Sequence, residues 1–288
     1  GEVVKEVRLL PGGKDGGHAY MRNARRLKNG NYLYKVPFRD GHAVLKVYIG
    51  SRGALGRIYK SFANVVLYGQ TSYLAGTRKR IERECLALWA KHGFRTFGVY
   101  EDVDVKAPQA PPGYWLLLEY LDRIKIDAYV SDESRDWDDR LKIWHKFLDE
   151  FGRRHKLAID LREPRLVHEN GDGKHVMILD DGELLWFDFE MVYRSKRGVA
   201  QHVAHEIIQF LWQILKKCEP ETAERLLHEA VAHYPDRERL EDAWRFFLKS
   251  PNLFMRAARA IDMRRGRARK PTSKYNVARR LKEALERA

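Results

Sequence analysis

The hydrophobic period of this chain changes along its length, and that change limits the folds open to it. In residues 24–49 apolar side chains alternate with polar ones in "NYLYKVPF" and "AVLKVYI", a spacing typical of half-buried strands. Beyond about residue 200 the apolar spacing is helical, in "AQHVAHEIIQFLWQILKK", "ETAERLLHEAVAHY" and "LEDAWRFFL". A strand-rich first part therefore precedes a helix-rich second part, and the two meet near Leu121.

The first part is predicted to hold a small antiparallel sheet and one long helix. Asn29-Gly30 and Asp40-Gly41 separate three runs, "ARRLKNG", "NYLYKVPF" and "AVLKVYI", as hairpin turns do. The stretch "GTRKRIERECLALWAKHG" follows at helical spacing and ends at Gly93. A Pro-rich turn then leads into the apolar run "YWLLLEYLD", which is typical of a buried strand.

The second part is predicted to be mainly helical. A helix is expected from Trp137 through "RLKIWHKFLDEFGRRHKLAI", and two short strands flank the turn "LDDGEL" at residues 179–184. The fold class is therefore expected to be α+β. We expect a first domain over residues 1–121 and a second over residues 122–288.

Size and cysteine content indicate a folded chain in a reducing compartment. At 288 residues and 44% hydrophobic content, the chain can bury a substantial core. Cys85 and Cys218 are far apart and form no Cys-x-x-Cys motif, which argues against a disulfide scaffold or a zinc ribbon. No apolar run approaches the roughly 18 residues that span a bilayer, and the N-terminus carries no signal pattern. The expected compartment is the cytosol.

The charge balance favours an anionic partner. The chain has 54 Lys and Arg against 40 Asp and Glu, a formal net charge of +14. Residues 256–288 hold 12 of these basic residues and 3 acidic ones, so this segment alone carries a net +9. Such a segment is either a solvated basic face or a surface for an anionic substrate or membrane.

Lys46 is the first residue whose position suggests chemistry. It lies in the middle of "AVLKVYI", so its ammonium needs an anionic partner or a route to solvent. Glu82 shares a helix face with Cys85 and Trp89 and can point at the sheet, and Glu84 competes for that role. A lysine and a glutamate paired in this way orient the lysine onto nucleotide phosphates, although an ordinary edge-strand lysine has the same pattern.

The strip "LVHENGDGKHVMILDDGELLWFDFE", residues 166–190, places polar side chains around a strand pair. His168, Asn170 and His175 occupy the loop before the first strand. Asp188 follows the second strand, where its carboxylate could bind Mg²⁺, a hard ion that prefers oxygen ligands.

Two other stretches have ordinary alternatives. The run "LLLEYLD" is either a core strand or a hinge whose backbone from Glu119 to Leu121 pairs with an adenine edge. "HVAHE" at residues 202–206 has helical metal spacing but matches no zinc motif, so an amphipathic core helix is the better interpretation.

Taken in order, these features resemble the two-lobed protein-kinase-like fold, with a small antiparallel-sheet N-lobe and a mainly helical C-lobe. More narrowly, the chain resembles the bacterial lipopolysaccharide kinases, which phosphorylate heptose or Kdo sugars of the inner core. The resemblance covers about residues 20–215. It rests on the strand-end lysine with its basic connector and helix, on a histidine at the usual metal-binding asparagine position, and on the short segment "FEMVYRSKRGVAQHVAHEIIQFLWQIL".

The resemblance implies an ATP-dependent and Mg²⁺-dependent kinase acting on a sugar hydroxyl of the lipopolysaccharide core or a related anionic glycolipid. It implies a cytoplasmic protein, peripheral at the inner membrane, with no specific nucleic acid as partner. The implied ATP-binding residues are Lys46, Glu119, Leu121 and Gly30, the implied metal ligands are Asp188 and His175, and Glu82 would hold Lys46.

Asn170 departs from the family, which places an aspartate there to orient and accept the proton of the acceptor hydroxyl. An amide cannot take up a proton near neutral pH. Three explanations remain open: the chain is a pseudokinase, Glu169 or Asp172 substitutes as base, or the asparagine was introduced in place of the catalytic aspartate. A sparse glycine-rich loop, "LKNGN", is a second departure.

Two rival functions remain. The same fold could phosphorylate a small molecule such as an aminoglycoside, or a protein tyrosine, although the positive charge disfavours a cationic drug. A basic pseudokinase or nucleic-acid-binding module is the non-enzymatic alternative, for which a steep salt dependence of nucleic-acid binding would be the sign.

Overall fold

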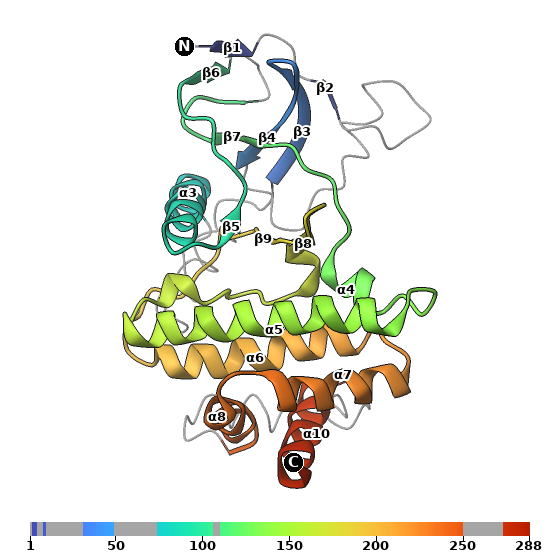
Figure 1. Ribbon diagram of the computed structural model, residues 1–288. Coiled ribbons are helices and arrows are strands. Elements are labelled where there is room, and N and C mark those ends of the chain that lie inside the picture. The colour runs from blue at the N-terminus through green and yellow to red at the C-terminus, as the bar shows by residue number, and fades with distance from the viewer. Residues whose placement is uncertain (1, 5–7, 10–30, 49–73, 106–109, 250–272) are drawn as a thin grey trace. The chain divides into compact units, whose positions relative to one another are not determined.

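The computed structural model describes residues 2–4, 8–9, 31–48, 74–105, 110–249 and 273–288 (Figure 1). The chain divides into two compact units. Unit 1 comprises Gly1–Asp122 and Phe187–Val192, and unit 2 comprises Arg123–Trp186 and Tyr193–Ala288. The sequence predicted one boundary near Leu121, whereas residues 187–192 belong with the first unit.

Unit 1 contains a four-stranded antiparallel sheet. Its strands are β2 (Arg8–Leu9), β3 (Asn31–Phe38), β4 (Gly41–Tyr48) and β7 (Trp115–Glu119), in the order β2-β3-β4-β7. Two shorter strands, β1 (Glu2–Val4) and β6 (Val103–Val105), pair in parallel as a separate ribbon. The turn between β3 and β4 falls at Arg39 and Asp40, where Arg39 has a φ of 51°.

The alternating pattern of β3 and β4 gives this sheet a buried face. Val36 and Ala43 stand opposite each other across the two strands, and both are buried together with Leu45, Val47 and Leu117. Their β-branched and aliphatic side chains suit a pleated surface that packs on one side.

One long helix, α3 (Ala75–Lys91), lies in the described part of unit 1. Its buried side chains recur at helical spacing and include Ile81, Cys85 and Trp89. The helix ends where predicted, because Gly93 adopts a φ of 75°, a conformation that costs glycine little. The short strand β5 (Arg95–Thr96) follows.

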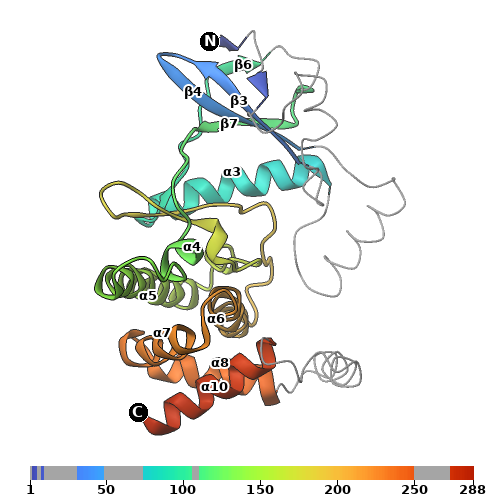
Figure 2. The ribbon, with the colours of Figure 1, turned by 90° about the vertical axis from the view of Figure 1, so that its right-hand side faces the viewer.

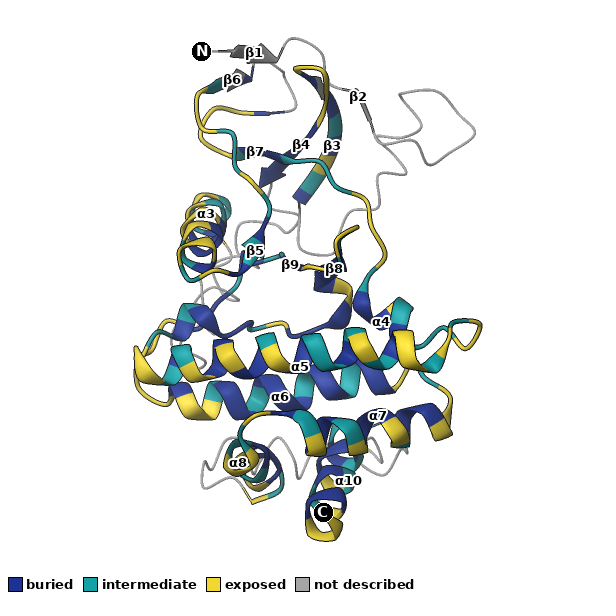
Figure 3. Ribbon diagram, in the orientation of Figure 1, coloured by how far each residue is buried: buried dark blue, intermediate teal, exposed yellow. Residues whose placement is uncertain are grey.

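Unit 2 is built around the 24-residue helix α5 (Trp137–Asp160), which begins where Asp136 accepts hydrogen bonds from two backbone N–H groups. The other α-helices among the described residues of unit 2 are α4 (Ile126–Val130), α6 (Val199–Leu215), α7 (Pro220–His233), α8 (Arg237–Lys249) and α10 (Lys274–Arg287). Helix α6 packs against α5, and α8 and α10 pack against α6 (Figure 2). Helix α5 carries exposed and buried stretches in turn, as an amphipathic helix does (Figure 3).

The polar loop and strand pair of unit 2 precede α6. The 3-10 turns η2 (Pro164–Leu166) and η3 (Gly173–His175) flank the loop, and strands β8 (Val176–Ile178) and β9 (Leu184–Trp186) form the predicted hairpin. Gly182, with a φ of 78°, lies in the turn between the strands.

The expected fold class is confirmed: the protein is α+β, with a small antiparallel sheet and a mostly helical remainder. No helix among the described residues is long and apolar enough to cross a bilayer. The predicted strand "ARRLKNG", its Asn29-Gly30 turn, the phosphate-loop residue Gly30 and the basic stretch 256–272 lie outside the described residues.

We predict that Gly152→Ala destabilises the protein. A Cβ atom at Gly152, within α5, would lie 2.2 Å from Cγ of Pro235. Alanine normally favours a helix over glycine by about 0.5–1 kcal/mol, but overpacking costs about 1–3 kcal/mol. Urea denaturation should therefore show a net loss of roughly 1 kcal/mol or more in the free energy of unfolding. Gly41→Ala is the control, because no atom lies within 4 Å of its new Cβ; equal unfolding midpoints for the two variants would contradict the prediction.

Candidate functional site

Lys46 is buried in β4 and ion-paired with Glu82 of α3. Because β4 lies between β3 and β7, Lys46 stands opposite Leu33 on one side and Leu116 on the other. Its Nζ lies 2.9 Å from Oε1 and 2.7 Å from Oε2 of Glu82, and only 7% of Lys46 and 3% of Glu82 are exposed. The Tyr48 hydroxyl donates a second hydrogen bond to Oε2 of Glu82. Unit 1 thus brings the predicted lysine and glutamate together.

Two further carboxylates surround the same ammonium. The Nζ of Lys46 lies 3.6 Å from Oδ1 of Asp188 and 3.6 Å from Oε1 of Glu190. Burial by itself would lower the pKa of Lys46, but Glu82, and then Glu190 and Asp188, outweigh it, and the pKa is raised above its usual value. Lys46 is therefore a permanent cation, which is the state that phosphate binding requires.

The helical phase of α3 decides between the two candidate glutamates. Glu82 lies four residues after Arg78 and three before Cys85, and all three side chains are buried on one face. Glu84 is exposed, and its Oε1 lies 3.8 Å from Nε of Arg80. A solvated pair of that kind contributes little to stability.

Asp188 combines an unusual backbone with a partly exposed side chain. Its φ of 71° is rare for a residue with a side chain; such strain costs about 1–3 kcal/mol and gathers at functional sites. The next residue, Phe189, is 1% exposed, and its ring centroid lies 4.4 Å from that of Trp89 on α3. The buried ring fixes the chain, while the Asp188 carboxylate stays 30% exposed as an oxygen ligand that suits Mg²⁺.

Glu190 joins this cluster although the sequence analysis assigned it no role. Its Oε1 accepts a hydrogen bond of 2.7 Å from Nδ2 of Asn31, and its Oε2 accepts one of 2.8 Å from Nη1 of Arg78. The pKa of Glu190 is raised to about 7, because burial and the nearby carboxylates of Asp188 and Glu82 outweigh the opposite effect of Lys46 and Arg78. The signal in the sequence was Arg78, which lies one helical turn before Glu82 and so shares its face.

In the expected adenine hinge, Glu119 already makes hydrogen bonds within unit 1. The N–H of Glu119 donates to the carbonyl of Gly98 at 2.9 Å, and the Glu119 carboxylate accepts two hydrogen bonds of 2.8 Å from Arg95. An adenine edge at this point would have to be met by the Glu119 carbonyl or by the backbone of Leu121, which is partly exposed.

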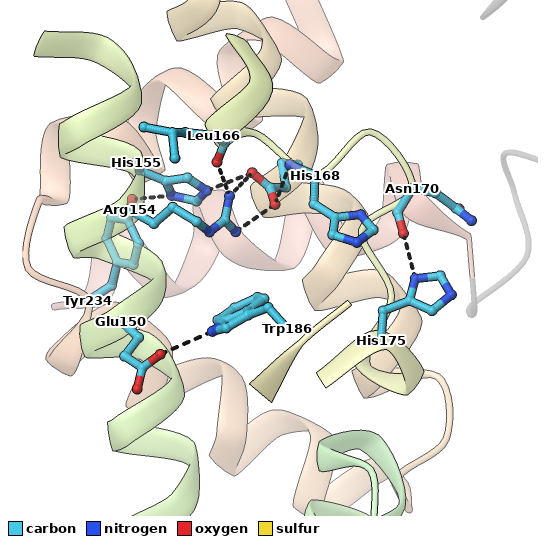
Figure 4. A network of polar contacts seen from close by, with 10 residues as sticks. Glu150, Arg154, His155, Leu166, His168, Asn170, His175, Trp186 and Tyr234 are labelled. Carbon is cyan, nitrogen blue, oxygen red and sulfur yellow. Dashed lines mark hydrogen bonds and ion pairs between the residues drawn. The ribbon is translucent and has the colours of Figure 1, made fainter. Parts of the chain in front are cut away.

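In unit 2, the loop that carries His168, Asn170 and His175 is held by its backbone. Nδ1 of His175 lies 3.2 Å from the Asn170 carbonyl oxygen (Figure 4), and the rings of His168 and His175 stack with centroids 5.3 Å apart. His168 and His175 are buried, whereas Asn170 is exposed. The loop therefore presents the Asn170 side chain to solvent on a fixed backbone.

The two alternative bases differ in how far they are already engaged. The Asp172 carboxylate is buried, caps η3 by accepting a hydrogen bond from the Lys174 N–H, and lies 3.2 Å from the Lys174 ammonium. The Asp172 carboxylate is therefore already occupied by contacts within its own loop. Glu169 is only partly buried and is the better candidate of the two.

A buried charge network lies behind this loop. Glu206 of α6 accepts two hydrogen bonds from Arg154 of α5, at 2.6 and 2.9 Å, and one of 3.0 Å from the His168 N–H. Arg154 also donates to the Leu166 carbonyl at 2.6 Å, and His155 lies between Glu206 and the Tyr234 hydroxyl (Figure 4). The network fixes both ends of the stretch that leads into the loop.

Arg154 supplies the cation of this network at neutral pH. Burial lowers the pKa of His155 to about 4, so its imidazole is neutral. Burial would raise the pKa of Glu206, but Arg154 and the hydrogen bonds outweigh it and bring that pKa to about 2. Glu206 belongs to the "HVAHE" stretch and is held by an arginine, in agreement with the core-helix interpretation.

Metal-binding residues are few in the part of the chain that the structure describes. No group of three or more His, Cys, Asp or Glu there could hold a metal ion by itself. Asp188 would supply one oxygen ligand to a Mg²⁺ ion, a donor type that suits this hard ion. His175 is buried and offers a nitrogen donor, which Mg²⁺ prefers less than oxygen, and its predicted role as a metal ligand stays a prediction.

The comparisons with known proteins give matches among solved structures only. No protein-family model matches the chain, and no curated protein matches it. Among solved structures, an apo pseudokinase matches with 14% sequence identity and a TM-score of 0.36, over 89% of this chain and 88% of that chain. The order of the elements is the one that the kinase-like prediction requires: an antiparallel sheet with the strand lysine, a helix with the paired glutamate, and a mainly helical unit 2. The closer resemblance to lipopolysaccharide kinases stays a prediction.

We predict that Arg154→Met destabilises the protein by about 3–5 kcal/mol, because it leaves the buried Glu206 without its cation. Urea denaturation at pH 7 measures the loss. The double variant Arg154→Met/Glu206→Gln should recover part of it, since no charge then stays buried alone. Arg153→Met, on the exposed side of the same helix, is the matched control. Equal unfolding free energies for Arg153→Met and Arg154→Met would contradict the prediction.

Proposed function

We propose that this protein is an ATP-dependent phosphotransferase that acts on a hydroxyl group. The observation that supports it is the buried Lys46–Glu82 pair with Asp188 beside it in unit 1. Burying a lysine among three carboxylates costs desolvation energy, and such an arrangement is expected where a fixed cation is needed to bind an anion.

Each residue of the cluster has a distinct role in the proposal. Lys46 binds the nucleotide phosphates, and Glu82, which accepts a hydrogen bond from Tyr48, holds the Lys46 ammonium in place. Asp188 would hold Mg²⁺, which neutralises phosphate charge when bound. Catalysis of this kind depends on positioning and on charge compensation, so the strained and partly buried Asp188 backbone contributes by fixing its carboxylate.

For the acceptor we propose a sugar hydroxyl of the lipopolysaccharide core or a related anionic glycolipid. The sequence resemblance and the net charge of +14 support this choice over a cationic small molecule. The basic residues between 256 and 288 would then meet the anionic lipid surface, which would make the protein peripheral at the cytoplasmic face of the inner membrane.

Asn170 is the residue least consistent with an active enzyme. Its amide can orient a hydroxyl by hydrogen bonding but cannot accept the proton. The exposed side chain on a backbone held by His175 suits a base position whose carboxylate is missing. The same observation favours a second candidate function, a nucleotide-binding pseudokinase, and the two differ in what an aspartate at this position would do.

We predict that Asn170→Asp raises turnover by roughly 10²–10⁴-fold, the usual contribution of a general base. The assay is mass spectrometry of core oligosaccharide incubated with ATP and Mg²⁺, where transfer adds one phosphate. ATP affinity should hardly change, because Lys46 and Asp188 provide it. If Glu169 is the base, the parent protein already turns over and Glu169→Gln stops it. ATP binding without transfer in either form would identify a pseudokinase.

We further predict that Lys46→Ala and Asp188→Ala each abolish transfer in the Asn170→Asp background while the protein stays folded by circular dichroism. Each removes a charge that the phosphates or the metal require. Lys91→Ala and Asp102→Ala, two exposed positions in unit 1, are the controls and should keep full activity. Normal transfer by both site variants would refute the assignment.

A further inference from the structure

Glu190 is bound from three separate elements of unit 1. Asn31 at the start of β3 donates to it at 2.7 Å, Arg78 of α3 donates at 2.8 Å, and the ammonium of Lys46 on β4 lies 3.6 Å away. The contacting side chains are all at least nine-tenths buried. The Glu190 carboxylate therefore links strands β3 and β4 and helix α3 beside the Lys46 ammonium.

The contacts close into a ring through α3. Arg78 and Glu82 lie one helical turn apart on the buried face, with opposite charges. Glu82 binds Lys46, Lys46 faces Glu190, and Glu190 binds Arg78. Helix α3 is thus linked to Lys46 in two ways: Glu82 binds the ammonium directly, and Arg78 binds Glu190, which faces the same ammonium.

Loss of the Glu190 charge would remove an ion pair of 2.8 Å from Arg78. The Arg78 guanidinium is 1% exposed, and a buried cation that loses a carboxylate gains from another carboxylate within reach. Glu82 is the carboxylate within reach on its own helix at the i,i+4 spacing. Arg78 would then compete with Lys46 for Glu82, and the ammonium would lose its fixed position.

We propose that Glu190 and Arg78 are positioning residues for Lys46. Glu190 keeps Arg78 away from Glu82, and so keeps Glu82 on the lysine that binds nucleotide phosphates. The proposal rests on the function proposed above and adds to it the residues that set the geometry of the phosphate-binding lysine. Asn31 extends the same anchor to the first residue of β3.

The test compares the affinities of ATP and adenosine by calorimetry, in Mg²⁺ at pH 8, where the carboxylates are ionised. Glu190→Gln should weaken ATP binding roughly tenfold, a usual coupling between contacting residues. Adenosine binding should stay within about twofold, since adenosine has no phosphate for Lys46 to bind. A general structural defect would weaken the binding of ATP and of adenosine alike. If Glu190→Gln leaves the ratio of the two affinities unchanged, the proposal is overturned.

A second variant tests the competition itself. In Arg78→Met/Glu190→Gln the competing cation is gone, so ATP affinity should recover most of the way toward the parent value. Arg80→Met and Glu84→Gln, an exposed pair on the same helix, are the matched controls and should bind both ligands like the parent. A double variant that binds ATP no better than Glu190→Gln would overturn the competition.

Amide hydrogen exchange separates this proposal from the function on which it rests. A parent protein that binds no ATP would refute the proposed function. The anchoring of α3 is still measurable in that case, because Glu190→Gln should speed exchange over residues 75–91 without any nucleotide, whereas Glu84→Gln should not. Equal exchange in Glu190→Gln and the parent would overturn the positioning role.

Discussion

The structure of unit 1 depends on one constraint: the ammonium of Lys46 is buried, and a buried ammonium must be surrounded by carboxylates. Glu82 can reach it only if α3 packs on the sheet with one definite face inward. That requirement fixes the rotation of the helix, buries Arg78 on the same face, and calls for a further anion, which Glu190 supplies. The ion pair therefore organises the packing around it.

The charges of this cluster do not cancel. Lys46 and Arg78 face Glu82, Asp188 and Glu190, and the raised pKa of Glu190 is one physical sign of the burial and crowding of carboxylates. A nucleotide would bring more negative charge, so phosphate binding at this point calls for an additional cation beside Asp188. In the proposed reaction, a divalent metal bound to Asp188 would supply that charge.

In unit 2, a buried ion pair holds the backbone of the loop that carries His168, Asn170 and His175. Arg154 donates a hydrogen bond to the Leu166 carbonyl, and Glu206 accepts one from the His168 N–H. Both side chains are fully buried. A buried pair of this kind adds little net stability compared with apolar residues, but it specifies one backbone position. The Asn170 backbone is held by His175 while its side chain is exposed, as the proposed function requires of a residue that would meet an acceptor hydroxyl.

Local periodicity in the sequence was enough to predict the β3–β4 hairpin, the phase and end of α3, and the β8–β9 hairpin, because strand and helix patterns depend on neighbours a few residues apart. It placed Glu82 on the inner face but left Glu84 open, since a helix pattern tolerates either beside an apolar stripe. Only the tertiary structure brought Asn31 and Glu190 together, across 159 positions of the chain. Their pairing depends on how strands and helix pack in three dimensions and on the demand of buried cations for anions, and no local pattern carries that information.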